Sequence, residues 1–470
     1  MSRQAETPST WRPELPGGGR WAERLAEAIA ADIASGRLRP GDQLPTQRAL
    51  AKHLGITPGT VNRAYAIAER MGVVSAEVGR GTFVTATGDA AIHSTGLGKT
   101  VAINFALNYP AASDVERPLA EMLMQLSQDR NVADLMGVSP YAGRPQHRAA
   151  GARWLRHFGL SVTAEDVLLC TSVQHGLAAS LAALTAPGDV VLTEALTSPS
   201  IKALAAIHQL RLVAVAGDDE GILPDALVHA QQTTGARVLY TMPSVHTPTA
   251  LTMSERRRRA ITAVLREQAL VAIEDDAWGF MATDTPTPLQ ALAPEAVIYL
   301  SSFSKCLASG LRVGYVVTSS PTQRNAIASC IGATSWTPPL AAEMASRWID
   351  DGTASSIMQR RVRAAQERQR MAVRHLASFF VPAATPAFHI WLPLPEPWRV
   401  DEFVANAEHL GVSLAPTDIF VPGREPTPHA VRVCFSAEEH VGRVEEGLGI
   451  LAAMLKAGPS GYGAALHAMP

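Results

Sequence analysis

From residue 101 onward, short apolar runs alternate with stretches whose apolar residues have helical spacing. Runs of this length are typical of buried strands, and the stretches between them are long enough for helices that return the chain to the same edge of a sheet. The seven runs are VLLC at 167, VVL at 190, LVAVA at 212, VLYTM at 238, LVAIED at 270, VIYLSS at 297 and VGYVV at 313. The alternation predicts an α/β domain with a largely parallel sheet.

A second, smaller lobe is expected toward the end of the chain. Residues 386–454 contain the strand-like runs AFHIWLPL and AVRVCFS between helical stretches, which favours an α+β arrangement. We place the sheet and this lobe in one domain, residues 101–458. We expect residues 459–470 to form an irregular tail.

The N-terminal residues have a different pattern, in which helix signals follow one another closely. Apolar residues at helical spacing predict a first helix over residues 21–34. Thr46 can cap a second helix that ends at Gly55. Thr57 with Pro58 directly after it can open a third helix.

Two β-rich runs complete this N-terminal region. They occupy residues 73–84 and flank the sequence Gly79-Arg80-Gly81, which predicts a hairpin with a glycine turn. Three helices and a hairpin predict a winged helix-turn-helix over residues 1–84. Residues 85–100 are small, polar and glycine-containing, and we interpret them as a linker.

Composition limits the partners and the compartment of the chain. The formal net charge is −2, so no overall positive field attracts nucleic acid or an anionic membrane, and any affinity for DNA must be local. The four cysteines are too scattered for a zinc motif or a disulfide framework, which favours a reducing cytoplasm. The N-terminus lacks a signal-peptide pattern, and no apolar run is long enough for a membrane span. We therefore expect a cytoplasmic protein that does not bind membranes.

The segment SSFSKCLASGLRVGY, residues 301–315, indicates a specific chemistry. Lys305 can form an imine with an aldehyde if a desolvated pocket lowers its pKa, and Arg312 can hold a phosphate. Asp275 ends the apolar run ALVAIEDD, where a carboxylate could pair with a protonated pyridine nitrogen. Together these residues predict a pocket for pyridoxal phosphate.

Motif order then carries a family resemblance over nearly the whole chain. The run PGDQLPTQRALAKHLGITPGTVNRAY precedes an EDD run and the pattern SFSKxLxxGLRxGY. The first part resembles a GntR-type winged helix, and the rest resembles fold-type I aminotransferases with a large and a small lobe. The fusion resembles the MocR-type transcriptional regulators, which implies a homodimer that binds operator DNA.

In a helix-turn-helix, the N-terminal residues of the third helix read the major groove while other donors hold phosphates. The residues expected to face DNA are Thr57, Thr60, Asn62 and Arg63. The resemblance also implies phosphate contacts for Arg48 and Tyr65, and a minor-groove contact for Arg80 at the wing tip.

The resemblance assigns roles around the cofactor as well. It implies that Lys305 is the imine lysine, that Arg312 and Ser302 bind the phosphate, and that Asp275 pairs with the pyridine nitrogen. A strand-to-helix turn at residues 171–175 can aim the amides of Val173 and Gln174 at the phosphate. Two further residues complete the set of expected contacts, Tyr141 to the cofactor of the neighbouring protomer and Arg432 to the carboxylate of an amino-acid effector.

Four positions depart from the family pattern. Val173 stands where a glycine usually opens the phosphate turn, and Ser198 or His175 stands where an aromatic residue stacks on the ring. Thr247 replaces the asparagine that bonds the ring hydroxyl, and Trp278 replaces a tyrosine and offers only a donor. The pattern predicts that cofactor binding is retained and that catalysis is impaired.

Two charged runs have simpler interpretations. Arginines 256–259 are interpreted as the solvated face of a helix rather than as a nucleic-acid contact. The acidic run 274–276 lacks histidine partners, so we expect no metal site there.

The sequence thus predicts a DNA-binding regulator that carries pyridoxal phosphate and senses an amino acid, an amine or pyridoxal phosphate itself. The alternative is an active aminotransferase with an accessory DNA-binding domain. A third option is a regulator whose pocket has lost the cofactor.

Overall fold

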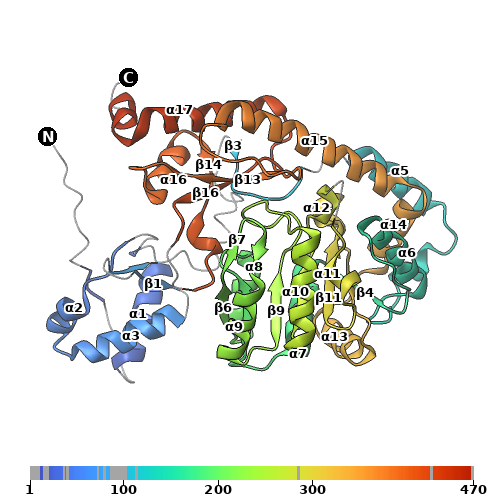
Figure 1. The fold of residues 1–470 in the computed structure, drawn as a ribbon, viewed down its shortest axis with the longest axis horizontal. Helices are drawn as coiled ribbons and strands as arrows, with labels where there is room; N and C mark the ends of the chain where they lie inside the picture. Colours follow the sequence, from blue (N-terminus) through green and yellow to red (C-terminus); the bar gives the residue numbers. More distant parts are fainter. Residues whose placement is uncertain are drawn as a thin grey trace. The chain divides into compact units, whose positions relative to one another are not determined.

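The computed structural model describes residues 11–13, 21–34, 37–38, 42–70, 73–77, 81–84, 103–111, 115–282, 286–423 and 427–466. The chain divides into two compact units, Met1–Lys99 and Thr100–Pro470, which Figure 1 colours along the sequence from blue to red. Each unit has a hydrophobic core of its own, and each is described by itself. The expected linker, residues 85–100, lies outside the described residues.

The first unit contains the predicted helices and hairpin. Its elements are α1 (Trp21–Ala34), α2 (Gln47–Leu54), α3 (Pro58–Arg70), β1 (Val74–Glu77) and β2 (Gly81–Val84). Thr46 caps α2 because its hydroxyl accepts a hydrogen bond from the Ala49 amide at 3.3 Å. Gly55 ends α2 with a φ of 67°, the left-handed conformation that favours glycine. The helix boundaries predicted from these two signals are confirmed.

The core of this unit forms between α1 and α3. Leu25 and Ile29 belong to one apolar cluster with Val61 and Ala64, which are spaced for one face of α3. The strands β1 and β2 pair antiparallel. Arg80, the expected residue of the wing tip, lies outside the described residues.

The second unit is built on a seven-stranded sheet of order β4-β12-β11-β10-β9-β5-β6. The strands are β4 (Val167–Cys170), β5 (Val190–Glu194), β6 (Arg211–Val215), β9 (Val238–Thr241), β10 (Val271–Asp275), β11 (Val297–Ser302) and β12 (Gly314–Val317). All pairings are parallel except those of β12, which is antiparallel to both of its neighbours. Each of the seven apolar runs is a strand of this sheet, so the prediction of a largely parallel sheet is confirmed.

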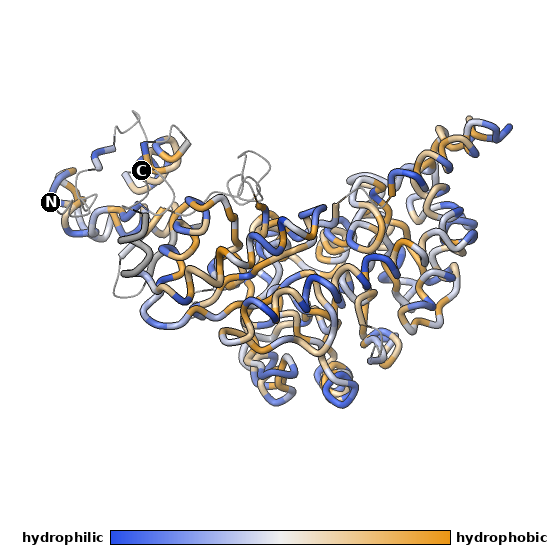
Figure 2. The backbone as a smooth tube through the Cα atoms, turned by 90° about the horizontal axis from the view of Figure 1, so that it is seen from above, coloured by the Kyte–Doolittle hydropathy of each residue, from blue (hydrophilic) through white to orange (hydrophobic). Residues whose placement is uncertain are grey.

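Helices flank the sheet (Figure 1). The α-helices are α5 (Glu116–Ser127), α6 (Pro145–Leu155), α7 (Val173–Leu184), α8 (Pro199–Ile207), α9 (Pro224–Thr234), α10 (Glu255–Glu267), α11 (Leu289–Leu292), α12 (Phe303–Cys306), α13 (Pro321–Thr334), α14 (Pro339–Asp350) and α15 (Thr353–Leu376). Short 3₁₀ helices are η2 (Val132–Met136), η3 (Arg156–Phe158), η4 (Gly279–Met281) and η5 (Ser309–Leu311). Apolar and hydrophilic residues alternate along the helices (Figure 2), as expected of helices that bury one face.

One helix approaches the sheet closely enough to require a glycine. A Cβ atom on Gly176 of α7 would lie 2.9 Å from Val316 and 3.2 Å from Leu300. Because the interior is close-packed, a larger residue would push α7 away from β11 and β12. The close approach therefore fixes the N-terminus of α7 beside the ends of these strands.

The smaller lobe contains the two predicted strands. Its elements are β3 (Ile103–Asn104), β13 (His389–Pro393), α16 (Val400–His409), β14 (Val412–Ser413), β15 (Ala415–Pro416), η6 (Thr417–Phe420), β16 (Ala430–Cys434) and α17 (Val441–Leu466). A two-residue hairpin, β7 (Gly217–Asp218) and β8 (Gly221–Ile222), belongs to the larger lobe. The helix α17 continues to Leu466 across a kink at Gly458, where φ is 70°. The structure therefore differs from the expected irregular tail over residues 459–466.

The arginine run of α10 corrects one expectation. Arg256 and Arg259 are exposed and pair with glutamates, as expected of a solvated face. Arg258 is fully buried and donates hydrogen bonds to the carbonyl oxygens of Met253 and Pro243. Arg257 is 8% exposed. The interpretation of the whole run as solvated is wrong for Arg257 and Arg258, because α10 turns these two residues toward the protein interior, where charged donors need fixed acceptors.

The described part of the chain has neither a membrane-spanning helix nor a cluster of metal-ligating side chains. No helix there combines the length and the apolar character that a bilayer crossing requires. The described ranges also contain no group of three or more histidine, cysteine, aspartate or glutamate side chains that could hold a metal ion.

Candidate cofactor-binding site and nucleic-acid interface

Lys305 lies in α12, directly after β11. Its Nζ donates a hydrogen bond to the Asn108 carbonyl oxygen and lies 3.2 Å from the centroid of the Tyr109 ring and 5.4 Å from that of Trp278. Burial, assisted by the positive charge of Arg432, lowers the pKa of Lys305 to about 7. A large fraction of the amine is therefore neutral near neutral pH, which is the form that attacks an aldehyde.

Asp275 ends β10 and faces the same region. It is 5% exposed, and it accepts hydrogen bonds from the Tyr240 hydroxyl at 2.7 Å and from the Ala277 amide at 3.1 Å. Burial raises the pKa of Asp275 to about 6, while the bond from Tyr240 and the charge of Lys305 act in the opposite direction. The mutual influence of Asp275 and Lys305 shows that the structure brings the two predicted groups together.

The expected phosphate ligands gather at the N-terminus of α7. Ser172 caps this helix through the His175 amide at 3.1 Å, and Val173 and Gln174 are its first two residues. The first amides of a helix have no partner within it and attract anions. Arg312 is exposed. Burial lowers the pKa of His175, and the positive charge of the nearby Arg312 lowers it further. This cation beside a helix N-terminus is the arrangement that a phosphate requires.

Ser302 is also close to this region, at the start of α12. It is 4% exposed, and its hydroxyl accepts a hydrogen bond from the Ser304 amide at 3.4 Å. In the described part of the chain, the guanidinium of Arg312 makes no ion pair. Both groups therefore keep capacity for an anionic ligand.

Arg432 projects from β16 into the surroundings of Lys305. Its Nη2 donates to the Ala106 carbonyl oxygen at 2.7 Å, and its guanidinium carbon lies 4.9 Å from the Phe420 ring centroid. Its Nε is buried and has no hydrogen-bond partner among the described residues. The side chain thus has unused donors near the amine, although it already bonds a backbone carbonyl.

The positions that depart from the family pattern have defined places. Trp278 is 2% exposed and stacks on Phe280 with 5.9 Å between ring centroids. Thr247 is 6% exposed and follows the loop after β9. Ser198 caps α8 by accepting a hydrogen bond from the Ser200 amide at 3.3 Å. His175 bonds Thr334 through Nε2 at 2.8 Å.

Tyr141 lies on the surface of the second unit. Its side chain is 52% exposed, and its ring centroid lies 6.2 Å from that of Trp336. An exposed tyrosine beside a half-exposed tryptophan is available to a partner surface.

In the first unit, the described residues expected to face DNA are exposed or half-exposed. The hydroxyls of Thr57 and Thr60 are 2.9 Å apart, and Asn62 accepts a hydrogen bond from Gln47 at 2.9 Å. Arg63 donates to the Gly59 carbonyl oxygen of its own helix at 3.4 Å. They occupy the start and first turns of α3, and the exposed Arg48 lies in α2.

Tyr65 is placed differently from these residues. It is 4% exposed, and its hydroxyl donates to the Pro45 carbonyl oxygen at 2.7 Å. Burial raises the pKa of Tyr65 above its usual value. In this structure the hydroxyl ties α3 to the segment before α2, so we leave it out of the proposed DNA contacts.

Comparison with known proteins assigns both units. The family "Aminotransferase class I and II" matches residues 101–448, and "Bacterial regulatory proteins, gntR family" matches residues 21–84. The uncharacterized HTH-type transcriptional regulator YdeF of Bacillus subtilis is 27% identical over 452 residues, which cover 95% of this chain and 97% of that protein. The chain belongs to the MocR-type transcriptional regulators.

Two further similarities concern parts of this MocR-type regulator. The HTH-type pyridoxine biosynthesis transcriptional regulator PdxR of Corynebacterium glutamicum is 27% identical over 309 residues, which cover 64% of this chain and 66% of that protein. An archaeal alanine:glyoxylate aminotransferase superposes with a TM-score of 0.71 at 22% identity, over 78% of this chain and 94% of that structure. The latter shows the aminotransferase fold of the second unit.

Three residues of the MocR-type regulator's site were not predicted from its sequence. They are Tyr240, Asn108 and Tyr109. Tyr240 had a usable signal, because a hydroxyl in a strand predicted to be buried needs a polar partner. Asn108 and Tyr109 reach Lys305 from a segment that is distant in sequence and carries no periodic pattern.

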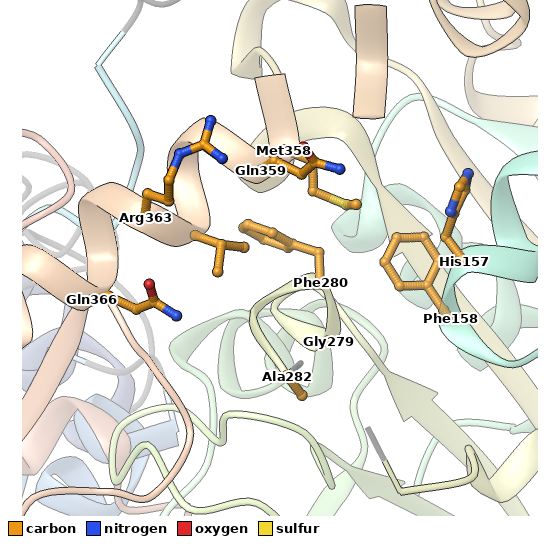
Figure 3. A pocket seen from close by; sticks show the side chains of 10 residues that line it. His157, Phe158, Gly279, Phe280, Ala282, Met358, Gln359, Arg363 and Gln366 are labelled. Atoms are coloured by element: carbon orange, nitrogen blue, oxygen red, sulfur yellow. The ribbon is translucent and has the colours of Figure 1, made fainter. Parts of the chain in front are cut away.

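The second unit also contains a cavity of about 290 Å³ between η4 and α15 (Figure 3). Phe158 and Phe280 line it together with Met358, Arg363 and Gln366 of α15. None of the expected site residues lines this cavity. It is therefore distinct from the surroundings of Lys305.

Proposed function

We propose that this regulator binds pyridoxal phosphate as an imine on Lys305 and responds to an amino acid, an amine or pyridoxal phosphate itself. The observation that carries this proposal is the half-buried Lys305, whose pKa is lowered to about 7, facing the buried Asp275. A basic and an acidic group whose pKa values are both strongly shifted are typical of a functional site.

The residues of the pocket fit each chemical part of the cofactor. Lys305 serves the aldehyde, and Asp275 serves the pyridine nitrogen. The phosphate would be held by Arg312, Ser302 and the amides of Val173 and Gln174 at the N-terminus of α7. Pyridoxal phosphate, when bound, supplies an aldehyde that condenses reversibly with primary amines.

The effector and the second protomer complete the proposed site. We assign the carboxylate of an amino-acid effector to Arg432, which has an unpartnered buried Nε among the described residues. We assign Tyr141, which is exposed, to the cofactor of the neighbouring protomer in a homodimer. PdxR, one of the matched regulators, is named for pyridoxine biosynthesis, which supports keeping pyridoxal phosphate among the candidate effectors.

Operator DNA is the proposed macromolecular partner, and the cytoplasm is the proposed compartment. The proposed DNA contacts are Arg48, Thr57, Thr60, Asn62 and Arg63, with Arg80 at the wing tip. The described members of this set are exposed or half-exposed polar side chains, as groove and phosphate contacts require.

Sensing, rather than turnover, is the proposed use of the pocket. Lys305, Asp275 and Arg312 serve capture, whereas Thr247 and Trp278 occupy positions that tune the ring in related enzymes. Trp278 is buried and lacks a phenol, so it cannot act as an acid at the ring hydroxyl. A captured effector that is not consumed persists as a signal.

The experiment has two parts. The purified protein should absorb near the visible edge, and borohydride should abolish that band by reducing the imine. A panel of amino acids with a 2-oxo acid acceptor should then give no more than about one product per site. Steady transamination at about 1 per second or faster would replace this proposal with an active aminotransferase. Absence of the band after incubation with pyridoxal phosphate would show that the pocket no longer holds the cofactor.

A further inference from the structure

A buried tyrosine links β9 to Asp275. Tyr240 has no exposed area, and its hydroxyl donates to Asp275 Oδ2 at 2.7 Å. The carboxylate therefore has a buried donor on the neighbouring strand.

The sheet register makes this link a property of the fold. Tyr240 pairs with Ile273 on the adjacent parallel strand, and Asp275 lies two residues beyond Ile273. Side chains two residues apart on a strand share a face, so Tyr240 and Asp275 lie on the same face of the sheet. The long phenol side chain then spans the remaining distance along the strand.

We infer that Tyr240 is a positioning residue that keeps Asp275 ionised and aimed at the ring nitrogen of the cofactor. The inference rests on the proposed function in one respect, the pairing of Asp275 with pyridoxal phosphate. The link between Tyr240 and Asp275 itself rests on the hydrogen bond.

Asp275 needs such a donor because its surroundings oppose its charge. Burial raises its pKa to about 6, and the neighbouring Asp276 raises it further, while Tyr240, the Ala277 amide and Lys305 lower it. Glu194 of β5 is also buried, accepts hydrogen bonds from Thr241 and the Met242 amide, and raises the pKa of Tyr240 through its charge. Loss of the Tyr240 donor would raise the pKa of Asp275 further, and a neutral carboxyl cannot balance a protonated ring nitrogen.

The same sheet contains a matched control. Tyr299 of β11 is fully buried and donates to Asp276 Oδ2 at 2.5 Å. Tyr299→Phe removes an equally buried hydroxyl from a neighbouring aspartate that is not assigned to the cofactor. If Tyr240→Phe changes the pKa of Asp275 and Tyr299→Phe does not, the effect is specific to the hydrogen bond between Tyr240 and Asp275.

The first measurement uses the full-length protein without cofactor. Infrared difference spectra against pH report the protonation of Asp275, whose band is identified by its loss in Asp275→Asn. Removing a hydrogen bond to a charged group should raise the pKa of Asp275 by about one to two units in Tyr240→Phe. Tyr299→Phe should not raise it.

The second measurement uses the protein loaded with pyridoxal phosphate labelled with ¹⁵N in the ring. The ¹⁵N chemical shift reports whether the ring nitrogen is protonated, independently of activity. We expect a protonated nitrogen at pH 7 in the unmodified protein and in Tyr299→Phe, and partial loss of that proton in Tyr240→Phe.

The outcomes separate the two ideas. An unchanged Asp275 pKa in Tyr240→Phe would overturn the inference, whatever the cofactor does. A raised pKa without cofactor binding in the unmodified protein would uphold the link and overturn the proposed function. If Tyr240→Phe does not fold, 3-fluorotyrosine at position 240 decides the question, because this stronger donor should lower the pKa of Asp275, and an unchanged pKa would overturn the inference.

Discussion

The two units of this regulator present their candidate binding groups in opposite ways. In the helix-turn-helix unit, Arg48, Asn62 and Arg63 are exposed. In the aminotransferase-like unit, Lys305 is half-buried and Asp275 is buried, and burial shifts the pKa of each toward neutrality. The candidate DNA contacts of the first unit are surrounded by water. In the second unit, the loss of water around Lys305 and Asp275 shifts their pKa values.

The difference predicts different controlling variables. Exposed charges act through water and are screened by salt, so DNA affinity should fall steeply with ionic strength. Buried groups are screened little and respond to pH, because desolvation acts on the charged form alone. The following changes test this separation, and they are ordered from the largest expected effect.

Lys305→Ala should abolish the absorbance of the bound cofactor while the protein remains folded, because Lys305 supplies the amine of the proposed imine. Lys202 is the matched control, since it is also half-buried with a pKa lowered by burial, but it donates to Asp418 O and Ile419 O at 3.0 Å. Visible spectra of Lys305→Ala and Lys202→Ala make the comparison. A normal band in Lys305→Ala would identify the wrong lysine.

Asp275→Asn should weaken binding of pyridoxal phosphate by about a hundredfold or more, because it leaves a buried cationic ring nitrogen without its partner. Equilibrium titration of the visible band measures the change. Asp276→Asn is the control, since Asp276 bonds Tyr299 instead of facing the proposed cofactor. Equal affinities for the two variants would argue against pairing through Asp275.

Arg63→Ala should reduce the discrimination between operator and random DNA by about 5- to 150-fold, as expected for the loss of a base contact. Arg48→Ala should weaken binding to both DNAs by a similar factor, because a phosphate contact carries no sequence information. Binding is measured on both DNAs at several salt concentrations. The assignment fails if Arg48→Ala changes discrimination more than Arg63→Ala does.

The rate at which the cofactor-free protein captures pyridoxal phosphate should rise about tenfold between pH 6 and pH 8. Lys305 has a pKa of about 7, so its neutral fraction grows by this factor over the interval. Stopped-flow absorbance measures the rate, and an Asp275→Asn background removes the titration of that carboxyl near pH 6. A rate that keeps rising toward pH 10 would mean that burial does not lower the pKa of Lys305.

Local signals explain why much of the fold could be predicted. The cap at Thr46, the left-handed Gly55 and the seven apolar runs depend on residues close in sequence, and the structure reproduces them. Arg258 was misjudged because its burial depends on carbonyl oxygens from another segment of the fold. Exposure of a charged residue is set by tertiary partners, which a run of arginines does not reveal.

The pocket was predicted only in part, for a related physical reason. Asp275 ends β10 and Lys305 follows the end of β11, so sequence order places these two residues at one edge of the sheet. Tyr240 reaches the site through strand register, and Asn108 reaches it through a contact between segments 197 residues apart. Neither the register of neighbouring strands nor a contact between segments far apart in sequence can be read from the spacing of nearby residues.

The single reversed strand of the sheet has a further consequence. Because β12 runs antiparallel to β11 and β4, it begins at the edge where those two strands end. The chain therefore delivers Lys305 and Arg312 to one edge through a short turn, without a crossover helix between them. The short connection therefore sets the distance between the Lys305 amine and the Arg312 guanidinium. Inserting even one residue between them should disrupt the pocket, while each strand could still form.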